Sequence, residues 1–197
     1  QADLAWQAYL TMQPDLVMLG DDNALKYLGP RFAQTDTPVV YLGINNNPRN
    51  YLTTLPKNIT GILERPLLKR SIVYIPEIMA GKLDRILILF DAGITSETLL
   101  KEVFLDKSHL SIGPVAIDIM QINQISEWRN AILTAPEQGY DAIVVGLYHT
   151  LIRSNGEHVP EQEVITWSSR HTQIPLFAFW NFAVGEQMTV GGLVLDA

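Results

Sequence analysis

The sequence predicts an α/β protein built from parallel, doubly wound sheets. Short apolar runs without polar alternation recur along the 197 residues, and a segment with helical periodicity follows most of them. Strands of this kind are buried on both faces, and their alternation with helices is typical of parallel sheets that helices cover on both sides. The rhythm starts afresh after Gly81, which favours two lobes over one wide sheet.

The predicted elements alternate along the whole chain. Strand-length apolar runs occupy Asp15–Gly20, Pro38–Gly43, Ile59–Leu63, Asp84–Asp91, Pro114–Met120, Ala142–Leu147, Pro175–Trp180 and Gly192–Leu195. Helical segments occupy Leu4–Met12, Asn23–Phe32, Arg65–Ala80, Ser96–Phe104, Ser126–Leu133 and Pro160–His171. Asp21 or Asp22, and Ser96, are expected to cap the helices that they precede, because their side-chain oxygens can accept free amide protons. Pro76 is expected to interrupt its helix.

Two features of the pattern bear on domain organisation. The stretch Pro76–Leu83 has the character of a joint between lobes. The chain opens on a helix that feeds its first strand, and it ends on the strand Gly192–Leu195 without a covering helix. Because a doubly wound lobe normally begins with a strand, the pattern predicts a fragment that lacks units at both ends.

The composition argues against several classes of function. The net charge is −7 and only 14 Lys and Arg are spread along the chain, whereas a nucleic-acid-binding surface needs clustered positive charge. The absence of cysteine excludes thiolate metal sites, thiol nucleophiles and disulfides. The nucleophile elbow, the P-loop, the dinucleotide fingerprint and the paired-histidine zinc motif are all missing. We therefore expect no nucleic-acid partner, no catalysis, no cofactor and no metal.

Polar and aromatic residues follow the predicted strands. In open α/β sheets, ligands bind beyond the carboxyl ends of the strands. The residues at these positions are Asp21–Asn23, Asn45–Asn47, Asp91, Gly93, Thr95, Tyr148–Thr150, Trp180 and Asn181. Carboxylates and amides pair with an ammonium group, and aromatic faces cover apolar surface, so the set predicts a site for a small polar or zwitterionic ligand.

Each of these groups also has a purely structural interpretation. The segment Asp21–Asn23 can be a helix cap alone, and Asn45–Pro48 is a natural turn, because Asn tolerates left-handed backbone and Pro fixes the next bend. Asp91 can cap the helix after its strand. His149 has no second histidine at a metal-ligand spacing and can be a hydrogen-bonding loop residue, while Trp180 can be core packing.

Six segments in register resemble the ABC-transporter substrate-binding family, which has the type I periplasmic-binding-protein fold. They are Pro14–Pro30, Thr37–Tyr51, Asn58–Arg65, Asp84–Glu97, Tyr140–Thr150 and Ile174–Gly192, and they cover nearly the whole chain. The resemblance implies two Rossmann-like lobes. Residues 1–77 would form lobe 1, with 188–197 returning to it, residues 82–185 would form lobe 2, and 78–81 with 186–187 would form the hinge. Family members also continue at both ends, which agrees with truncation.

The resemblance implies a function as well. The two lobes would close on an amino-acid-like or other small metabolite, without catalysis. The cleft-facing residues would be Asp22, Asn23, Asn45, Asp91, Tyr148, His149, Trp180 and Asn181. Related domains are the periplasmic, extracytoplasmic sensors of bacterial histidine kinases and other signal-transduction receptors, tethered by the parent's transmembrane segment. The sequences at Asp21–Ala24 and Gly43–Pro48 look closer to these sensors.

Three alternatives remain open. The chain can be the substrate-binding component of an ABC transporter, which presents its closed form to a membrane permease. It can be the cytoplasmic effector-binding domain of a transcriptional repressor that shares this fold. It can also be a hydrolase or transferase on a flavodoxin-like sheet. A homodimer is compatible with each of the binding roles.

Overall fold

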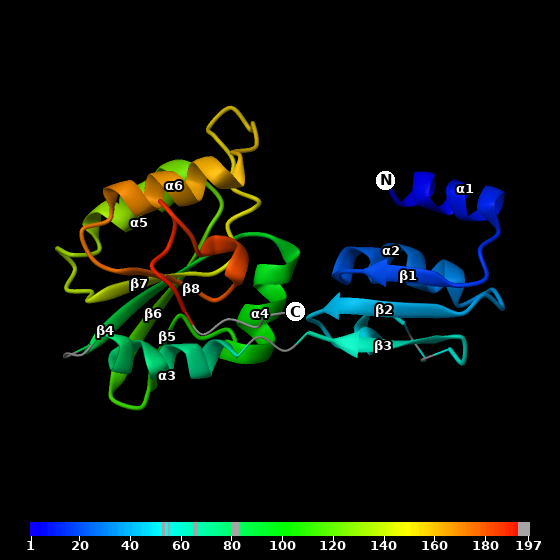
Figure 1. Cartoon of the computed structure of the whole chain (residues 1–197), viewed down its shortest axis with the longest axis horizontal. Helices are drawn as coiled ribbons and strands as arrows, with labels where there is room; N and C mark the ends of the chain where they lie inside the picture. Colours follow the sequence, from blue (N-terminus) through cyan, green and yellow to red (C-terminus); the bar gives the residue numbers. More distant parts are fainter. Residues whose placement is uncertain (53, 55, 65–66, 80–82, 193–197) are drawn as a thin grey trace. The chain divides into compact units, whose positions relative to one another are not determined.

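The computed structural model describes residues 1–52, 54, 56–64, 67–79 and 83–192, and Figure 1 shows the whole chain. The chain divides into two compact units, Gln1–Arg65 and Pro66–Ala197, which we call unit 1 and unit 2. Each unit has its own sheet and helices, as the predicted α/β class requires. In the described ranges, no helix is long and apolar enough to cross a membrane.

Unit 1 is a three-stranded parallel sheet with two helices. Its elements are α1 (Ala2–Met12), β1 (Val17–Gly20), α2 (Asp22–Phe32), β2 (Val39–Ile44), the 3₁₀ turn η1 (Pro48–Asn50) and β3 (Ile59–Leu63), with the strand order β1-β2-β3. As predicted, α1 ends at Met12, and the left-handed backbone of its C-cap Gln13 (φ 45°) turns the chain into Pro14. The cap predicted at Asp21 is confirmed, because its carboxylate accepts the amide protons of Asn23 and Ala24.

The core of unit 1 lies between the sheet and these two helices. Leu25 and Phe32 of α2 are buried against inward-facing strand residues such as Tyr41. The rings of Trp6 and Tyr9 on α1 meet the Phe32 ring edge-on, with centroids 5.1 and 4.8 Å away. Edge-to-face pairs of this kind add about 0.5–1.5 kcal/mol each beyond the burial of area, so they hold α1 onto α2.

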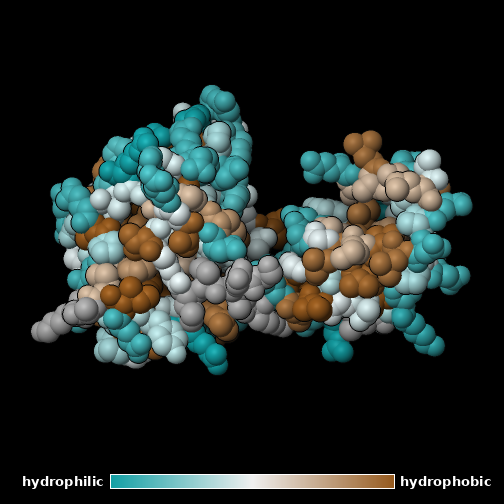
Figure 2. Space-filling model, viewed as in Figure 1, coloured by the Kyte–Doolittle hydropathy of each residue, from teal (hydrophilic) through white to brown (hydrophobic). Residues whose placement is uncertain are grey.

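The other face of this sheet carries exposed apolar side chains. Met18, Leu42 and Ile62 are 64%, 41% and 75% exposed, and Figure 2 shows apolar side chains gathered over the strands of unit 1. Side chains alternate across a strand, so these three point away from the core that α1 and α2 cover. Among the described residues, the helical cover expected on both faces is therefore present on only one face of unit 1.

Unit 2 is a five-stranded sheet with helices on both faces (Figure 1). Its strands are β4 (Arg85–Asp91), β5 (His109–Ile112), β6 (Val115–Ile122), β7 (Ala142–Val145) and β8 (Leu176–Ala178), in the order β5-β6-β4-β7-β8. Its helices are α3 (Leu68–Ile78), α4 (Ile94–Phe104), α5 (Ile125–Thr134) and α6 (Glu161–His171), with the 3₁₀ turn η2 (Asn181–Ala183) near the end. All strand neighbours are parallel except β5, which runs antiparallel to β6.

The sequence of β4 lacks polar alternation because both faces of this strand are buried. Every residue from Ile86 to Phe90 is at most 1% exposed. Leu87 and Leu89 pack with residues of α5 and α6 such as Trp128, whereas Ile86 and Phe90 pack with α3 and α4. Each fully buried aliphatic or aromatic side chain contributes about 1.5–3 kcal/mol. Unit 2 therefore has the doubly wound arrangement that the sequence predicts.

The sequence does not predict β5. Its residues alternate between exposed and half-buried, because it pairs with one neighbour at the edge of the sheet and never forms a continuous apolar run. It is joined to β6 by a tight turn, in which Gly113 supplies the left-handed backbone (φ 60°) that such a turn requires. An edge hairpin of this kind adds a strand without a crossover helix.

The two units divide at a different point from the predicted lobes. Helix α3 packs on the sheet of unit 2 through Leu68, Ile72 and Ile75, so residues 68–77 belong with unit 2 rather than with a first lobe of residues 1–77. The expected interruption of this helix is also wrong, because α3 continues through Pro76 to Ile78.

The C-terminal segment differs from the prediction as well. Residues 188–197 are expected to return to lobe 1, but the described part of this segment pairs with β8 of unit 2. The Val190 amide donates to the Leu176 carbonyl at 2.9 Å, and the Ala178 amide donates to the Gly191 carbonyl at 2.9 Å. Residues 193–195 of the last predicted strand and residues 80–81 of the predicted hinge lie outside the described residues. The hinge at 78–81 and 186–187 stays a prediction.

Candidate functional site

The carboxyl end of the sheet in unit 2 brings three loops together. Asp91 ends β4, Tyr148–Thr150 follows β7, and Trp180 follows β8, and these three strands are consecutive neighbours. The Asp91 amide donates to the Leu147 carbonyl at 2.7 Å, so the pairing of β4 with β7 extends into the loops. A Cβ placed at Gly93 would lie 3.0 Å from the Thr150 methyl group. The predicted residues Asp91, Tyr148, His149, Trp180 and Asn181 are thus gathered at one end of one sheet.

Asp91 is buried at the centre of these loops and is only 2% exposed. Its Oδ2 accepts the Thr150 amide proton at 3.0 Å, and its Oδ1 accepts the Gly93 amide proton at 3.2 Å and the Ser96 hydroxyl proton. The predicted cap at Ser96 is wrong, because α4 begins one turn earlier and Gly93 is its N-cap. Ser96 is fully buried and points its hydroxyl at Asp91 instead.

Four aromatic rings line the same end of the sheet, and we call them the aromatic row. The Tyr148 and His149 rings are stacked at 4.7 Å, Phe182 meets His149 edge-on at 5.1 Å, and Trp180 stacks on Phe182 at 6.0 Å. Tyr148 is buried, Trp180 is half-buried, and His149 and Phe182 are exposed. The row therefore offers exposed ring surface, supported from behind by buried ring surface.

Tyr148 and His149, at the start of the row, are fixed in different ways. Burial, followed by the negative charge of Glu161, raises the pKa of the Tyr148 phenol to about 12, so this group is neutral at physiological pH. The His149 carbonyl accepts a hydrogen bond of 2.6 Å from Nε2 of His158. A carbonyl can only accept, so this contact fixes the proton of His158 on Nε2 and holds the backbone of the loop.

A second set of predicted residues lies at the carboxyl end of the sheet in unit 1. Asp22 is 2% exposed, and its Oδ2 accepts the Asn45 amide proton at 3.0 Å. Its Oδ1 accepts the Asn46 amide proton and the Tyr51 hydroxyl proton, both at 3.1 Å. Asn23 is exposed on the first turn of α2. Asp22, Asn23 and Asn45 are therefore brought together within unit 1.

The Asn45–Pro48 segment is both a turn and a candidate site. The Asn47 side chain caps η1 by accepting the Arg49 amide proton at 3.1 Å, which confirms the turn interpretation. Asn45 is different, because its Oδ1 is buried and has no hydrogen-bond partner, while its Nδ2 points at the Gly43 carbonyl at 3.5 Å. A buried acceptor without a partner costs free energy.

Two residues that sequence reasoning did not select contribute to these sites. Phe182 stands two positions after Trp180, and aromatic residues at alternate positions directly after a strand were the available signal. Tyr51 closes the polar loop after β2, within one of the six segments that carry the family resemblance. In the described ranges, no group of three or more His, Asp or Glu is placed to hold a metal ion.

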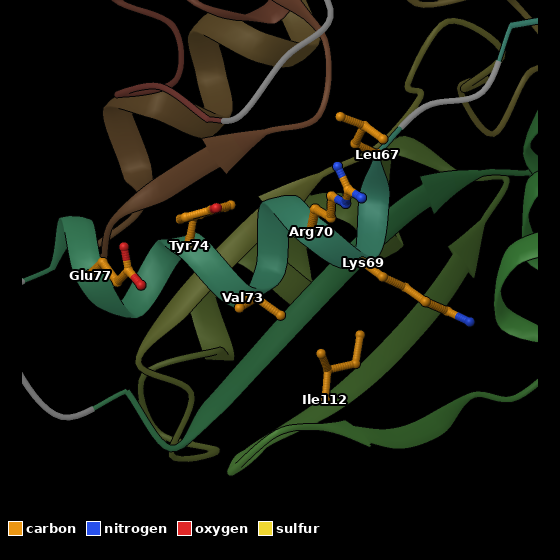
Figure 3. A pocket seen from close by; sticks show the side chains of 7 residues that line it. All are labelled: Leu67, Lys69, Arg70, Val73, Tyr74, Glu77 and Ile112. Atoms are coloured by element: carbon orange, nitrogen blue, oxygen red, sulfur yellow. The ribbon is translucent and has the colours of Figure 1, made fainter.

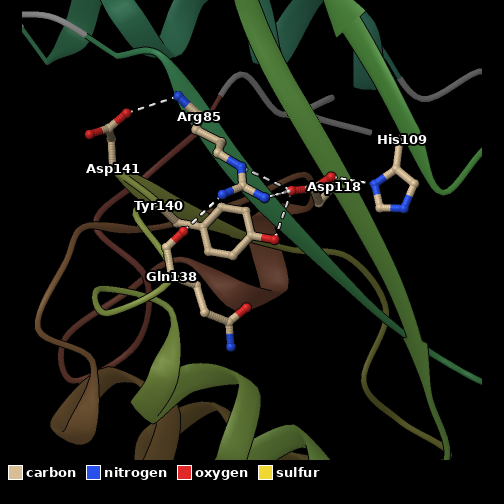
Figure 4. A network of polar contacts seen from close by, with 6 residues as sticks. All are labelled: Arg85, His109, Asp118, Gln138, Tyr140 and Asp141. Atoms are coloured by element: carbon tan, nitrogen blue, oxygen red, sulfur yellow. Dashed lines mark hydrogen bonds and ion pairs between the residues drawn. The ribbon is translucent and has the colours of Figure 1, made fainter.

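A polar network occupies the opposite, amino end of the sheet in unit 2 (Figure 4). Asp118 accepts hydrogen bonds from Arg85 Nη2 at 2.6 Å and from the Tyr140 hydroxyl at 2.8 Å, and it also contacts His109 Nδ1. Burial opposes ionisation of Asp118, but the hydrogen bonds from His109, Tyr140 and Arg85 lower its pKa overall. Burial and the bond to Asp118 raise the pKa of Tyr140 to about 12. These groups pair with one another and stabilise the fold.

An open groove of about 580 Å³ runs along the outer side of α3 (Figure 3). It is lined by Leu67, Lys69, Arg70, Val73, Tyr74, Glu77 and Ile112. Val73 and Tyr74 are 49% and 46% exposed. Ligand sites combine an enclosed apolar surface with convergent polar groups, and the long charged side chains here spread outward along the helix. The groove is therefore a weaker candidate than the strand ends.

Comparison with known proteins finds similar folds among solved structures but no similar sequence. No family model and no curated protein matches the sequence. Among solved structures, the chain is similar to a conserved domain protein from Vibrio cholerae O1 biovar El Tor, with 15% identity and a TM-score of 0.60 over 90% of this chain and 58% of that one.

Two further structures share the fold. One is an extracellular ligand-binding receptor from Verminephrobacter eiseniae, with 11% identity and a TM-score of 0.55 over 90% of this chain and 48% of that one. The other is the ligand-free, open structure of CD0873, a substrate-binding protein with adhesive properties from Clostridium difficile, with 14% identity and a TM-score of 0.58 over 90% and 57%. The chain spans about half the length of these proteins and shares their fold over that part, which confirms the predicted fold class.

Proposed function

We propose that this chain is an extracytoplasmic domain that binds an amino acid or a similar small metabolite and closes on it. In this proposal it is the non-catalytic sensor domain of a bacterial signal-transduction receptor such as a histidine kinase. The observation that carries the proposal is the convergence of three loops at the carboxyl end of the sheet in unit 2, on a fold shared with ligand-binding proteins. In open parallel sheets this is the end at which ligands bind.

The exposed side chains at these strand ends supply suitable chemistry. In unit 2, His149, Phe182 and Asn181 are exposed beside the half-buried Trp180. The rings offer flat apolar faces, and the amide offers a donor and an acceptor. In unit 1, the exposed side chain of Asn23 likewise offers an amide donor and acceptor. The exposed rings and amide of unit 2 match a metabolite with both polar and apolar parts.

Closure is the part of the proposal that comes from the family resemblance. A ligand shifts a conformational equilibrium only by its difference in affinity for the two states. A metabolite that contacts more of the protein in a closed state therefore favours that state. In a receptor, such a change would alter the membrane-proximal ends of the parent protein.

A role in transport is the second candidate, and one comparison favours it. CD0873 is described as a substrate-binding protein, whereas the Verminephrobacter eiseniae protein is described as a receptor. The parent gene distinguishes the two. A transmembrane helix and a kinase domain encoded after this segment would support the sensor, and a neighbouring permease gene without them would support the transporter.

Thermal unfolding with a panel of amino acids, purines and short metabolites tests the binding proposal. A compound present at a hundred times its Kd stabilises the folded protein by about 2.7 kcal/mol. For a chain of this size the melting temperature would then rise by about 5–10 °C. A panel that leaves the melting temperature unchanged at millimolar concentration would refute binding of these classes of metabolite.

A further inference from the structure

Each unit has one buried carboxylate at or just after the carboxyl end of a strand. Asp22 follows β1 and Asp91 ends β4, and each is 2% exposed. Each accepts three hydrogen bonds, of which at least one comes from the backbone of the loop after the neighbouring parallel strand. For Asp22 the donors in that loop are the amides of Asn45 and Asn46 after β2, and for Asp91 the donor is the amide of Thr150 after β7.

Little of either carboxylate is left for a ligand. A carboxylate has about four acceptor positions, and three are filled in each case by protein donors. A buried carboxylate is costly unless it keeps such bonds, and hydrogen bonds to an ionised acceptor are roughly twice as strong as neutral ones. A ligand ammonium would have to displace backbone amides to reach either group.

We propose that Asp22 and Asp91 are positioning residues, which clasp the ligand-binding loops without contacting the ligand. Asp22 holds the backbone at Asn45 and Asn46, and Asp91 holds the backbone at Thr150, directly after Tyr148 and His149. Contacts with the ligand are then made by the side chains of these loops and by the rest of the aromatic row. The assignment rests on the proposed binding function, and it differs from the cleft-facing role that the family resemblance implies for the two residues.

The unequal use of the two carboxylate oxygens provides a selective test. In Asp91→Asn, the amide oxygen can keep the bonds from Gly93 and Ser96, whereas the new NH₂ group replaces Oδ2 and faces the Thr150 amide donor to donor. In Asp22→Asn, the oxygen can keep the bonds from Asn46 and Tyr51, and the NH₂ group faces the Asn45 amide. Each substitution preserves shape. Asp91→Asn breaks the one backbone bond to the loop after β7, and Asp22→Asn breaks one of the two backbone bonds to the loop after β2.

Amide hydrogen exchange followed by NMR, without any added compound, measures directly how well the carboxylates protect the loop amides. We expect the Thr150 amide of Asp91→Asn, and the Asn45 amide of Asp22→Asn, to exchange at least about tenfold faster than in the wild type, because each loses a charge-assisted bond. Unchanged exchange at both amides would overturn the clasp. Two variants in separate units keep the test valid if one of them folds poorly.

Affinity for the amino acid that most stabilises the wild type then tests the positioning role. We expect each Asn variant to weaken it about tenfold or more. Asp141→Ala is the matched control, because Asp141 accepts the amide protons of Asp84 and Arg85, both at 2.8 Å, at the opposite end of the sheet. This control should lower stability and leave affinity unchanged.

The outcomes separate the two proposals. Faster exchange with unchanged affinity would overturn the positioning role, and so would an equal loss of affinity in Asp141→Ala. A wild type that responds to no amino acid would overturn amino-acid binding, and with it the role of both residues in binding. The exchange measurement would still show in that case whether the carboxylates clasp the loops.

Discussion

Phe182 provides the most direct test of the aromatic row, because it is exposed and was not selected from the sequence. A phenylalanine side chain presents about 200 Å², and 43% of Phe182 remains exposed. A ligand that covers this remainder would remove about 80 Å² from water, which is worth about 2 kcal/mol at 25 cal/mol per Å². Phe182→Ala should therefore weaken binding of a panel compound by up to about 30-fold.

Titration calorimetry with the compound that most stabilises the wild type measures this loss. Phe182→Ala should remain folded, with a melting temperature about 2–4 °C lower, because it loses its ring contacts with His149 and Trp180. Tyr74→Ala is the matched control, since Tyr74 is an aromatic residue of unit 2 with 46% exposure on α3. Equal affinities in Phe182→Ala and the wild type, or equal losses in the two variants, would refute the assignment of the row to ligand binding.

Two further predictions concern stability. Asp118→Asn should destabilise the protein by about 1.5–3 kcal/mol at pH 7. The pKa of Asp118 is held below its ordinary value of 3.8. The difference in free energy of unfolding between the wild type and the variant should therefore be constant above about pH 5, and it should shrink as the pH falls through the lowered pKa of the folded state. Urea unfolding between pH 7 and pH 2.5 measures this difference, and a pH-independent difference would contradict stabilisation by the ionised Asp118, which pairs with Arg85. Trp128→Phe should cost about 1–3 kcal/mol in urea unfolding at pH 7, because the fully buried indole N–H donates to Ser168 at 2.9 Å. An unchanged midpoint would show that this buried bond contributes nothing to stability.

Most of the fold can be predicted from the sequence because burial leaves a direct trace in composition. The run Ile86–Phe90 is continuously apolar since helices cover both of its faces, and β3 is found at its predicted bounds. The cap at Asp21 is also local, because it depends on one carboxylate and the next two amides. In each case a few neighbouring residues determine the element.

The errors arise where distant parts of the chain determine the outcome. The edge strand β5 is stabilised by its pairing with β6 and needs no apolar run of its own. The local sequence of α3 does not show which sheet the helix covers, and the packing of Leu68 and Ile72 assigns it to unit 2. Local patterns also predict that a hydroxyl such as that of Ser96 caps a helix, but they do not show that it donates its hydrogen bond to a buried carboxylate instead.

The candidate site shows the same division between location and role. The rule that ligands bind at strand ends locates every loop that the structure gathers, because strand order alone brings those ends together. The rule cannot distinguish residues that contact a ligand from residues that hold the loops, because the role of a carboxylate depends on how many protein donors reach it. Asp22 and Asp91 look like ligand contacts from the sequence, yet three donors surround each of them in the fold. The two carboxylates thus hold the loops in place through hydrogen bonds, and the surfaces that face outward are those of amide groups and rings. Recognition on such a surface would depend on shape, stacking and hydrogen bonding more than on net charge.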